Sequence, residues 1–182
     1  MRKIIRYIAA LALTLTAGST VHAETYLCIQ DIPGDVSVEG YEDCIQVIGF
    51  AERLNVEPPP PGGGSPIREF GPIRVVKRID RATPLLSISA ATGEILGPIL
   101  GQGVTLSFVR QCDEALVKYY EVRLLNGVVV TSVSATAGED IPTEQVSLSF
   151  NKIQWAYTPI NDDCSPDAEI TRGWNLETNA EF

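Results

Sequence analysis

The sequence predicts a mainly β protein, a barrel or sandwich of seven or eight strands with one short helix. Three observations predict it. Apolar and polar residues alternate with a period of two through most of the chain after residue 23, which is typical of half-buried strands. Turn residues separate these runs. Only one segment carries both a start signal and a stop signal for a helix.

Two strands are expected in the first part of the chain. One covers residues 26–30, and the other covers residues 44–50 and extends towards Val56. A run of prolines and glycines follows, which cannot lie inside a sheet, so we expect a long loop within one domain. This loop contains Pro58, Pro59, Pro60, Pro61, Gly62, Gly63 and Gly64.

A third strand is expected over residues 73–79, and the helix follows it. Thr83 is a suitable N-cap, Pro84 would occupy the first helical position, and Gly93 would end the helix. The apolar side chains expected to face the sheet are Leu85, Leu86 and Ile88.

The remaining strands are expected at residues 104–110, 115–125, 128–130 and 144–158. Asn126 and Gly127 separate two of them. This dipeptide is typical of a tight hairpin turn, because both residues tolerate a positive φ. In the last strand the alternating apolar residues are Val146, Leu148 and Phe150, then Ile153 and Trp155.

The first 23 residues are typical of a cleavable signal peptide. Three basic residues precede an apolar run over residues 7–15, which is shorter than the roughly 20 residues that span a bilayer. Small residues lead up to Ala23, so we expect cleavage between Ala23 and Glu24. The mature chain would be one domain over residues 24–182, secreted or periplasmic, with no membrane insertion after cleavage.

The mature chain would be acidic and would lack histidine. The sequence has 14 basic and 23 acidic residues, and removing the three basic residues of the signal leaves 11, a net charge of −12. Such a surface repels nucleic acid, so we expect no nucleic-acid partner. The single histidine, His22, lies in the signal. Serine triads, histidine acid–base catalysis and the usual zinc sites therefore lack a participant, and we expect neither an enzyme nor a cofactor.

Four cysteines, Cys28, Cys44, Cys112 and Cys164, follow the expected cleavage site. An even number in an exported chain predicts two disulfides, and the spacing fits neither a zinc finger nor a thioredoxin motif. Three pairings remain open. We favour Cys28 with Cys44 and Cys112 with Cys164, because each pair would join neighbouring strand ends.

Pairs of adjacent carboxylates are the other residues that could act as acid and base or bind a calcium ion. None of them has the spacing of an EF-hand, and all lie where loops are expected, so we interpret them as solvated turns. The pairs are Glu42 with Asp43, Asp113 with Glu114, Glu139 with Asp140, and Asp162 with Asp163.

Several segments carry a more specific pattern. Residues 80–86 read D-R-A-T-P-L-L, residues 119–124 read Y-Y-E-V-R-L, and residues 152–155 read K-I-Q-W ahead of Gly173 and Trp174. In this order, over roughly residues 26–176, the chain resembles the haemolysin-coregulated protein (Hcp) family, the inner-tube proteins of bacterial type VI secretion systems.

The resemblance implies a β-barrel of two packed antiparallel sheets with one short flanking helix. It also implies self-assembly into hexameric rings that stack into a hollow tube, whose lumen accommodates small effector proteins. The family has no catalytic residues. The loop from Pro58 to Pro72 matches the position of an extended loop that contacts the neighbouring ring, so we expect it to mediate assembly. The alternative is a monomeric periplasmic or extracellular binding module on the same fold.

Overall fold

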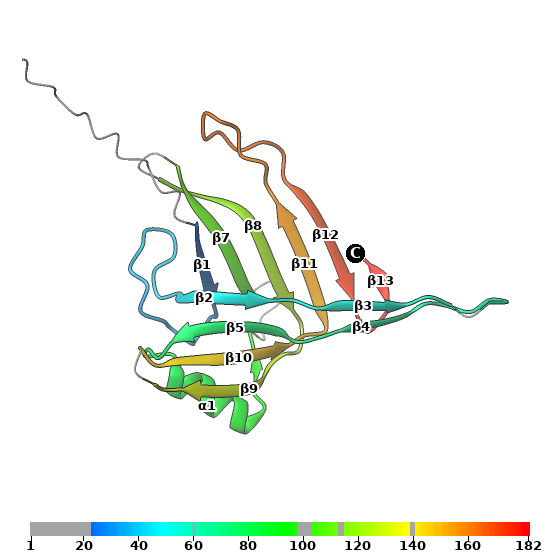
Figure 1. Ribbon diagram of the computed structural model, residues 1–182, viewed down its shortest axis with the longest axis horizontal. Helices are drawn as coiled ribbons and strands as arrows, with labels where there is room; N and C mark the ends of the chain where they lie inside the picture. Colours follow the sequence, from blue (N-terminus) through cyan, green and yellow to red (C-terminus); the bar gives the residue numbers. More distant parts are fainter. Residues whose placement is uncertain (1–22, 60, 98–102, 113–114, 139–140) are drawn as a thin grey trace, which may run out of the picture.

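The computed structural model describes residues 23–59, 61–97, 103–112, 115–138 and 141–182 (Figure 1). The signal peptide expected over residues 1–23 lies outside this part, except for Ala23. Ala23 and Glu24 open the first strand and pair with Arg110 and Val109. The described residues contain no helix with the length and hydrophobicity of a membrane span.

Strands make up most of the fold, as expected. Eleven of them form one hydrogen-bonded sheet, and β3 and β4 form a separate hairpin. The strands are β1 (Ala23–Cys28), β2 (Ile45–Ala51), β3 (Leu54–Glu57), β4 (Ile67–Phe70), β5 (Ile73–Arg78), β6 (Ile95–Leu96), β7 (Val104–Cys112), β8 (Ala115–Leu125), β9 (Val128–Thr136), β10 (Thr143–Ser149), β11 (Lys152–Tyr157), β12 (Ile170–Asn175) and β13 (Ala180–Glu181).

The sheet folds over into two antiparallel layers that enclose the core. Its strand order is β13-β12-β11-β8-β7-β1-β2-β5-β10-β9-β6. The direction of the strands changes sharply between β1 and β2, which share only three residue pairs (Figure 1). The expected two packed sheets are therefore confirmed. In the described residues the ladder stays open, with β13 and β6 as its ends.

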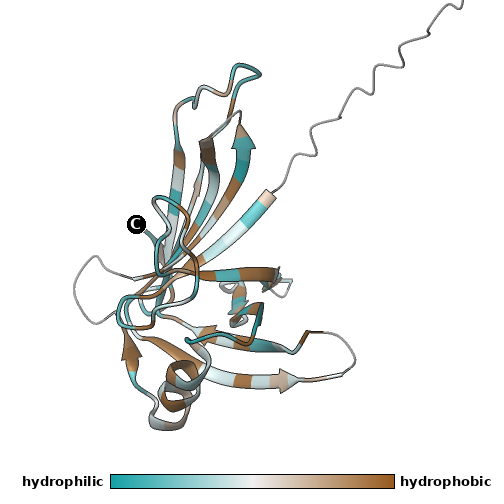
Figure 2. Cartoon of the chain, turned by 90° about the vertical axis from the view of Figure 1, so that its left-hand side faces the viewer, coloured by the Kyte–Doolittle hydropathy of each residue, from teal (hydrophilic) through white to brown (hydrophobic). Residues whose placement is uncertain are grey.

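Apolar side chains from both layers meet in one cluster. Hydrophobic and hydrophilic residues alternate along the strands, as the sequence predicts (Figure 2). The fully buried members with the largest side chains are Leu27, Ile45, Ile73, Leu86, Leu106, Leu124, Leu148 and Ile153.

The prediction of one continuous strand over residues 144–158 is wrong, because the structure has two strands there. The chain leaves β10 at Phe150 and Asn151 and crosses to the other layer, where it continues as β11 between β8 and β12. Phe150 is buried, and the backbone N–H of Asn151 donates to the carbonyl of Asn126. The alternating large apolar residues shift from even numbers, Val146, Leu148 and Phe150, to odd numbers, Ile153 and Trp155, and this shift is the sequence signal for the break.

The helix α1 (Thr83–Thr92) lies where it is expected and ends at Gly93, which has a φ of +67°. Two details differ. The N-cap is Ala82, and Thr83 already belongs to the helix. Leu86 is fully buried as predicted, but the prediction for Leu85 and Ile88 is wrong. These two side chains are exposed, because the buried stripe runs through Ala82, Leu86 and Ser89 at the three- and four-residue spacing of a helix.

Candidate assembly surfaces

The hairpin β3–β4 extends away from the two layers, in line with β2 and β5 (Figure 1). Its strands pair from Leu54 with Phe70 to Glu57 with Ile67, and the backbone N–H of Gly71 donates to the carbonyl of Arg53 at its base. Leu54, Val56 and Ile67 are exposed, with 66% of Ile67 accessible. A thin two-stranded element with apolar side chains towards water is typical of a contact surface.

The loop predicted to mediate assembly connects the two strands of this hairpin. Pro58, Pro59, Pro61 and the three glycines lie between β3 and β4, whereas Pro60 lies outside the described residues. Gly62, Gly63 and Gly64 have φ values of +108°, +118° and +126°, which favour glycine. The assembly role of this loop stays a prediction. The strands that carry the loop were not anticipated in full, although Leu54 and Val56 alternate with polar neighbours.

Two tryptophans anchor the base of the hairpin to the body. The indole N–H of Trp155 donates to Oε1 of Glu52 at 2.8 Å, and the guanidinium of Arg68 lies 5.1 Å from the ring centre of Trp174. Burial raises the pKa of Glu52, and the hydrogen bond from Trp155 opposes that rise. Burial, helped by the charge of Glu52, raises the pKa of Tyr120 to about 12. These two contacts tie the hairpin to the body.

A buried polar network fastens α1 to the sheet. Nζ of Lys77 lies 2.6 Å from Oε1 of Glu144 and 2.7 Å from Oδ1 of Asp80. The hydroxyl of Thr83 donates to the same Glu144 oxygen at 2.8 Å, and Asp80 accepts from the backbone N–H of Ala82. This explains why the segment at residues 80–86 carries an acid and a threonine in front of its Pro-Leu. Thr83 acts in this network and does not cap the helix.

The first disulfide closes a strap, residues 29–43, over the outer face of β1. Cys28 and Cys44 are bonded, and Tyr41 of the strap stacks on the buried Tyr26 with ring centres 4.7 Å apart. Arg81 ties the strap to the start of α1 through ion pairs with Asp35 and Asp43. Burial raises the pKa of Tyr26, and its hydrogen bond to Glu24 adds to the rise.

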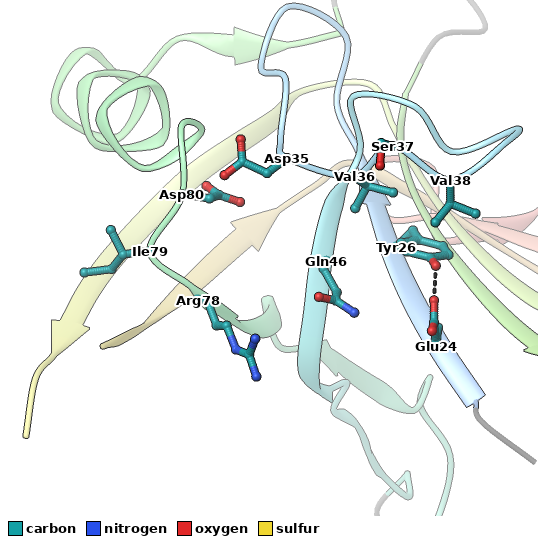
Figure 3. Close-up of a pocket in the computed structure, with 10 residues that line it drawn as sticks. All are labelled: Glu24, Tyr26, Asp35, Val36, Ser37, Val38, Gln46, Arg78, Ile79 and Asp80. Atoms are coloured by element: carbon teal, nitrogen blue, oxygen red, sulfur yellow. Dashed lines mark hydrogen bonds between the residues drawn. The ribbon is translucent and has the colours of Figure 1, made fainter. Parts of the chain in front are cut away.

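A cleft of about 350 Å³ lies between the strap and the end of β5 (Figure 3). Carboxylates and small apolar side chains line most of it. Its lining residues are Glu24, Tyr26, Asp35, Val36, Ser37, Val38, Gln46, Arg78, Ile79 and Asp80. In Figure 3 the side chain of Arg78 points away from Asp35 and Asp80.

The second disulfide joins Cys112, at the end of β7, to Cys164 in the loop between β11 and β12. Both disulfides follow the favoured pairing. Asp162 and Asp163 in this loop are exposed, as are Glu42 and Asp43 in the strap, in line with the interpretation as solvated turns. The other two acidic pairs lie outside the described residues.

Within residues 23–59, 61–97, 103–112, 115–138 and 141–182, no three side chains of histidine, cysteine, aspartate or glutamate form a group that could hold a metal ion. The structural features that stand out are surfaces: the hairpin, the strap and the exposed residues of α1.

Comparison with known proteins agrees with this picture. The family model "Type VI secretion system effector, Hcp" matches residues 26–157. The protein Hcp1 of Pseudomonas aeruginosa is 32% identical over 108 residues, which cover 58% of this chain and 63% of that protein. The match therefore spans less than two thirds of the relative's length.

Solved structures share the fold. A structure described as a type six secretion system protein superposes with a TM-score of 0.76 at 22% identity, covering 88% of this chain and all of the other. Hcp1 of Salmonella typhimurium gives a TM-score of 0.68 at 20% identity, with 88% and 99% of the two chains covered. The family match over most of the chain, together with this shared two-layer fold, shows that the protein belongs to the Hcp family of type VI secretion.

Proposed function

We propose that this protein is an exported tube subunit, which assembles with copies of itself into hexameric rings that stack into tubes. The observation that carries the proposal is the projecting β3–β4 hairpin, whose Leu54, Val56 and Ile67 are exposed. Two strands alone bury too little apolar surface to be stable in water, so a second surface must cover them. Membership of the Hcp family supports a second copy of the chain as that surface.

The proposal includes cleavage of a signal peptide between Ala23 and Glu24, which leaves a single domain over residues 24–182. The two disulfides support it, because such bonds persist in oxidising compartments. The mature protein would then act in the periplasm or outside the cell, and its tubes would carry small effector proteins. Intact-mass measurement of protein recovered from the periplasm tests the cleavage, since a chain that begins before Glu24 contradicts it.

Mass photometry of the mature protein tests assembly. Hexamers or larger rings are expected. In the variant V56S/I67S and in a deletion of Pro59 to Ser65, the stacks should shorten or disappear. The matched control is I88S, which removes an isoleucine that is 55% exposed on α1, away from the hairpin. If the deletion and V56S/I67S assemble as the wild type does, the hairpin has no assembly role.

A monomer in the same measurement would favour the alternative, a binding module on the Hcp fold. The observation in its favour is the cleft of about 350 Å³ beside the strap, which has the size of a small-ligand pocket. Wild-type monomers at micromolar concentration would contradict the tube subunit and leave this cleft as the site to test.

A further inference from the structure

In the layer that contains β2, β5, β10 and β9, the paired residues on one face include no acidic side chain among the described residues. Residues that pair directly across strands share a face of the sheet. The register of β2, β5, β10 and β9 therefore aligns three rows, which we call the arginine face. The rows are Ala51, Arg74, Ser147 and Ser132; Gly49, Val76, Gln145 and Ser134; and Arg78, Thr143 and Thr136.

The opposite face of these strands belongs to the core. Val75, Val133 and Val146 point there and pack with Leu86 of α1. The arginine face consequently points outward, and both Arg74 and Arg78 are exposed. Its composition is unusual for this chain, in which acidic residues outnumber basic ones by 23 to 14.

Neither arginine has an ion-pair partner among the described residues, whereas most other basic side chains do. Ion pairs engage Lys77, Arg81, Lys118, Arg123 and Arg172, while Arg68 and Lys152 lie over aromatic rings. Arg78 lines the same cleft as Asp35 and Asp80, but in Figure 3 its side chain points away from both of them. Two guanidinium groups thus stay available in a protein rich in carboxylates.

The surroundings of the two arginines leave them accessible to a large partner. They are four residues apart on one strand, which places their Cα atoms about 13 Å apart. Val76 lies between them, and alanine, serine and threonine flank the two arginines in their rows. Small neighbours let both guanidinium groups reach a flat partner, and each can bind a carboxylate through two parallel hydrogen bonds.

We propose that the arginine face binds an acidic polypeptide that is not a copy of this chain. A two-fold contact between two copies through this face would oppose arginine to arginine. The face also lacks the large apolar side chains that form the centre of stable self-interfaces. Nucleic acid is a poorer fit, because a long polyanion meets the negative charge of the whole protein. A local acidic patch meets mainly the arginines, since charges beyond about 8 Å are screened at physiological salt.

This inference goes beyond the proposed function, because it requires no ring. The probe is a fluorescent twelve-residue peptide with six glutamates, compared with peptides in which lysine or glutamine replaces each glutamate. Fluorescence anisotropy with the mature protein should show binding of the glutamate peptide alone, weakening as salt rises. The variant R74Q/R78Q should lose at least tenfold in affinity. The control R53Q/R172Q removes the same charge from exposed positions elsewhere and should stay within twofold.

Three outcomes overturn the inference: no binding of the glutamate peptide at low salt, equal binding of the lysine peptide, or equal losses in the two double variants. Mass photometry of the same samples separates this result from the proposed function. Rings that do not bind the glutamate peptide overturn the acidic partner only. Monomers that bind it through Arg74 and Arg78 overturn the ring only.

Discussion

The ammonium of Lys77 and the carboxylate of Glu144 lie 2.6 Å apart, and neither side chain is exposed. The pair connects neighbouring strands β5 and β10, and the hydroxyl of Thr83 adds the first turn of α1 to it. One ion pair thus joins the helix to the sheet. A buried pair of this kind makes the fold sensitive to the loss of either charge.

We expect E144Q to lower the free energy of unfolding by about 3 kcal/mol, because the buried ammonium of Lys77 then keeps Asp80 as its one remaining ionic partner among the described residues. The double variant K77M/E144L should lose less than E144Q. Urea denaturation measures both. The control E181Q removes the partner of Arg172 from an exposed ion pair and should cost about 1 kcal/mol or less. Equal losses for E144Q and E181Q would contradict the role of burial.

The anchoring of the hairpin predicts a local effect at Trp155. W155F keeps an aromatic ring but removes the indole N–H that binds Glu52, so it should cost about 1–2 kcal/mol. Hydrogen exchange should rise in β3 and β4 more than in β7 and β8. W174F keeps a ring under Arg68 and serves as the control. An unchanged exchange rate of the hairpin in W155F would show that other contacts hold it.

The two disulfides should contribute unequally to stability. They close segments with sequence separations of 16 and 52 residues. The chain-entropy model gives about 3 kcal/mol for C28A/C44A and about 4 kcal/mol for C112A/C164A. Denaturation of the two variants under identical oxidising conditions tests the order. A larger loss for C28A/C44A would indicate that the packing of the strap on Tyr26 matters more than loop entropy.

Gly34 lets the strap approach the start of β2. A Cβ at this position would lie 2.3 Å from the carbonyl oxygen of Cys44, closer than such atoms can come. G34A should therefore displace the strap and cost about 1–3 kcal/mol. G138A, where a Cβ meets nothing within 4 Å, is the matched control. Thermal unfolding of the two variants compares them, and equal stability would mean that the strap yields without strain.

The raised pKa of Tyr120 predicts a loss of stability at alkaline pH. In the unfolded chain the phenol loses its proton near pH 10, whereas in the folded protein its pKa is about 12. The contribution of this group is therefore complete below pH 10 and declines as the pH rises towards 12. Y120F should show a flatter decline of the urea midpoint over this range. Identical declines in both proteins would contradict the burial of this phenol.

Much of the fold follows from local signals. The turn at Asn126 and Gly127 has positive φ at both residues, as its type requires, and Gly93 ends the helix in the left-handed region. Strand β8 has the bounds that the alternation predicts. These features depend on short-range sterics and on which residues tolerate a positive φ, so a single sequence is enough to predict them.

The surfaces depend on long-range arrangement instead. The alternation of residues 144–158 predicts buried and exposed positions, but only the packing of two layers decides that the chain crosses between them at Phe150. Exposure of Leu85 and Ile88 likewise depends on where the sheet meets α1. Arg74 and Arg78 lie on one strand in any reading of the sequence. The rows without carboxylates that contain them arise from pairing with β2, β10 and β9, because register joins residues far apart in the chain.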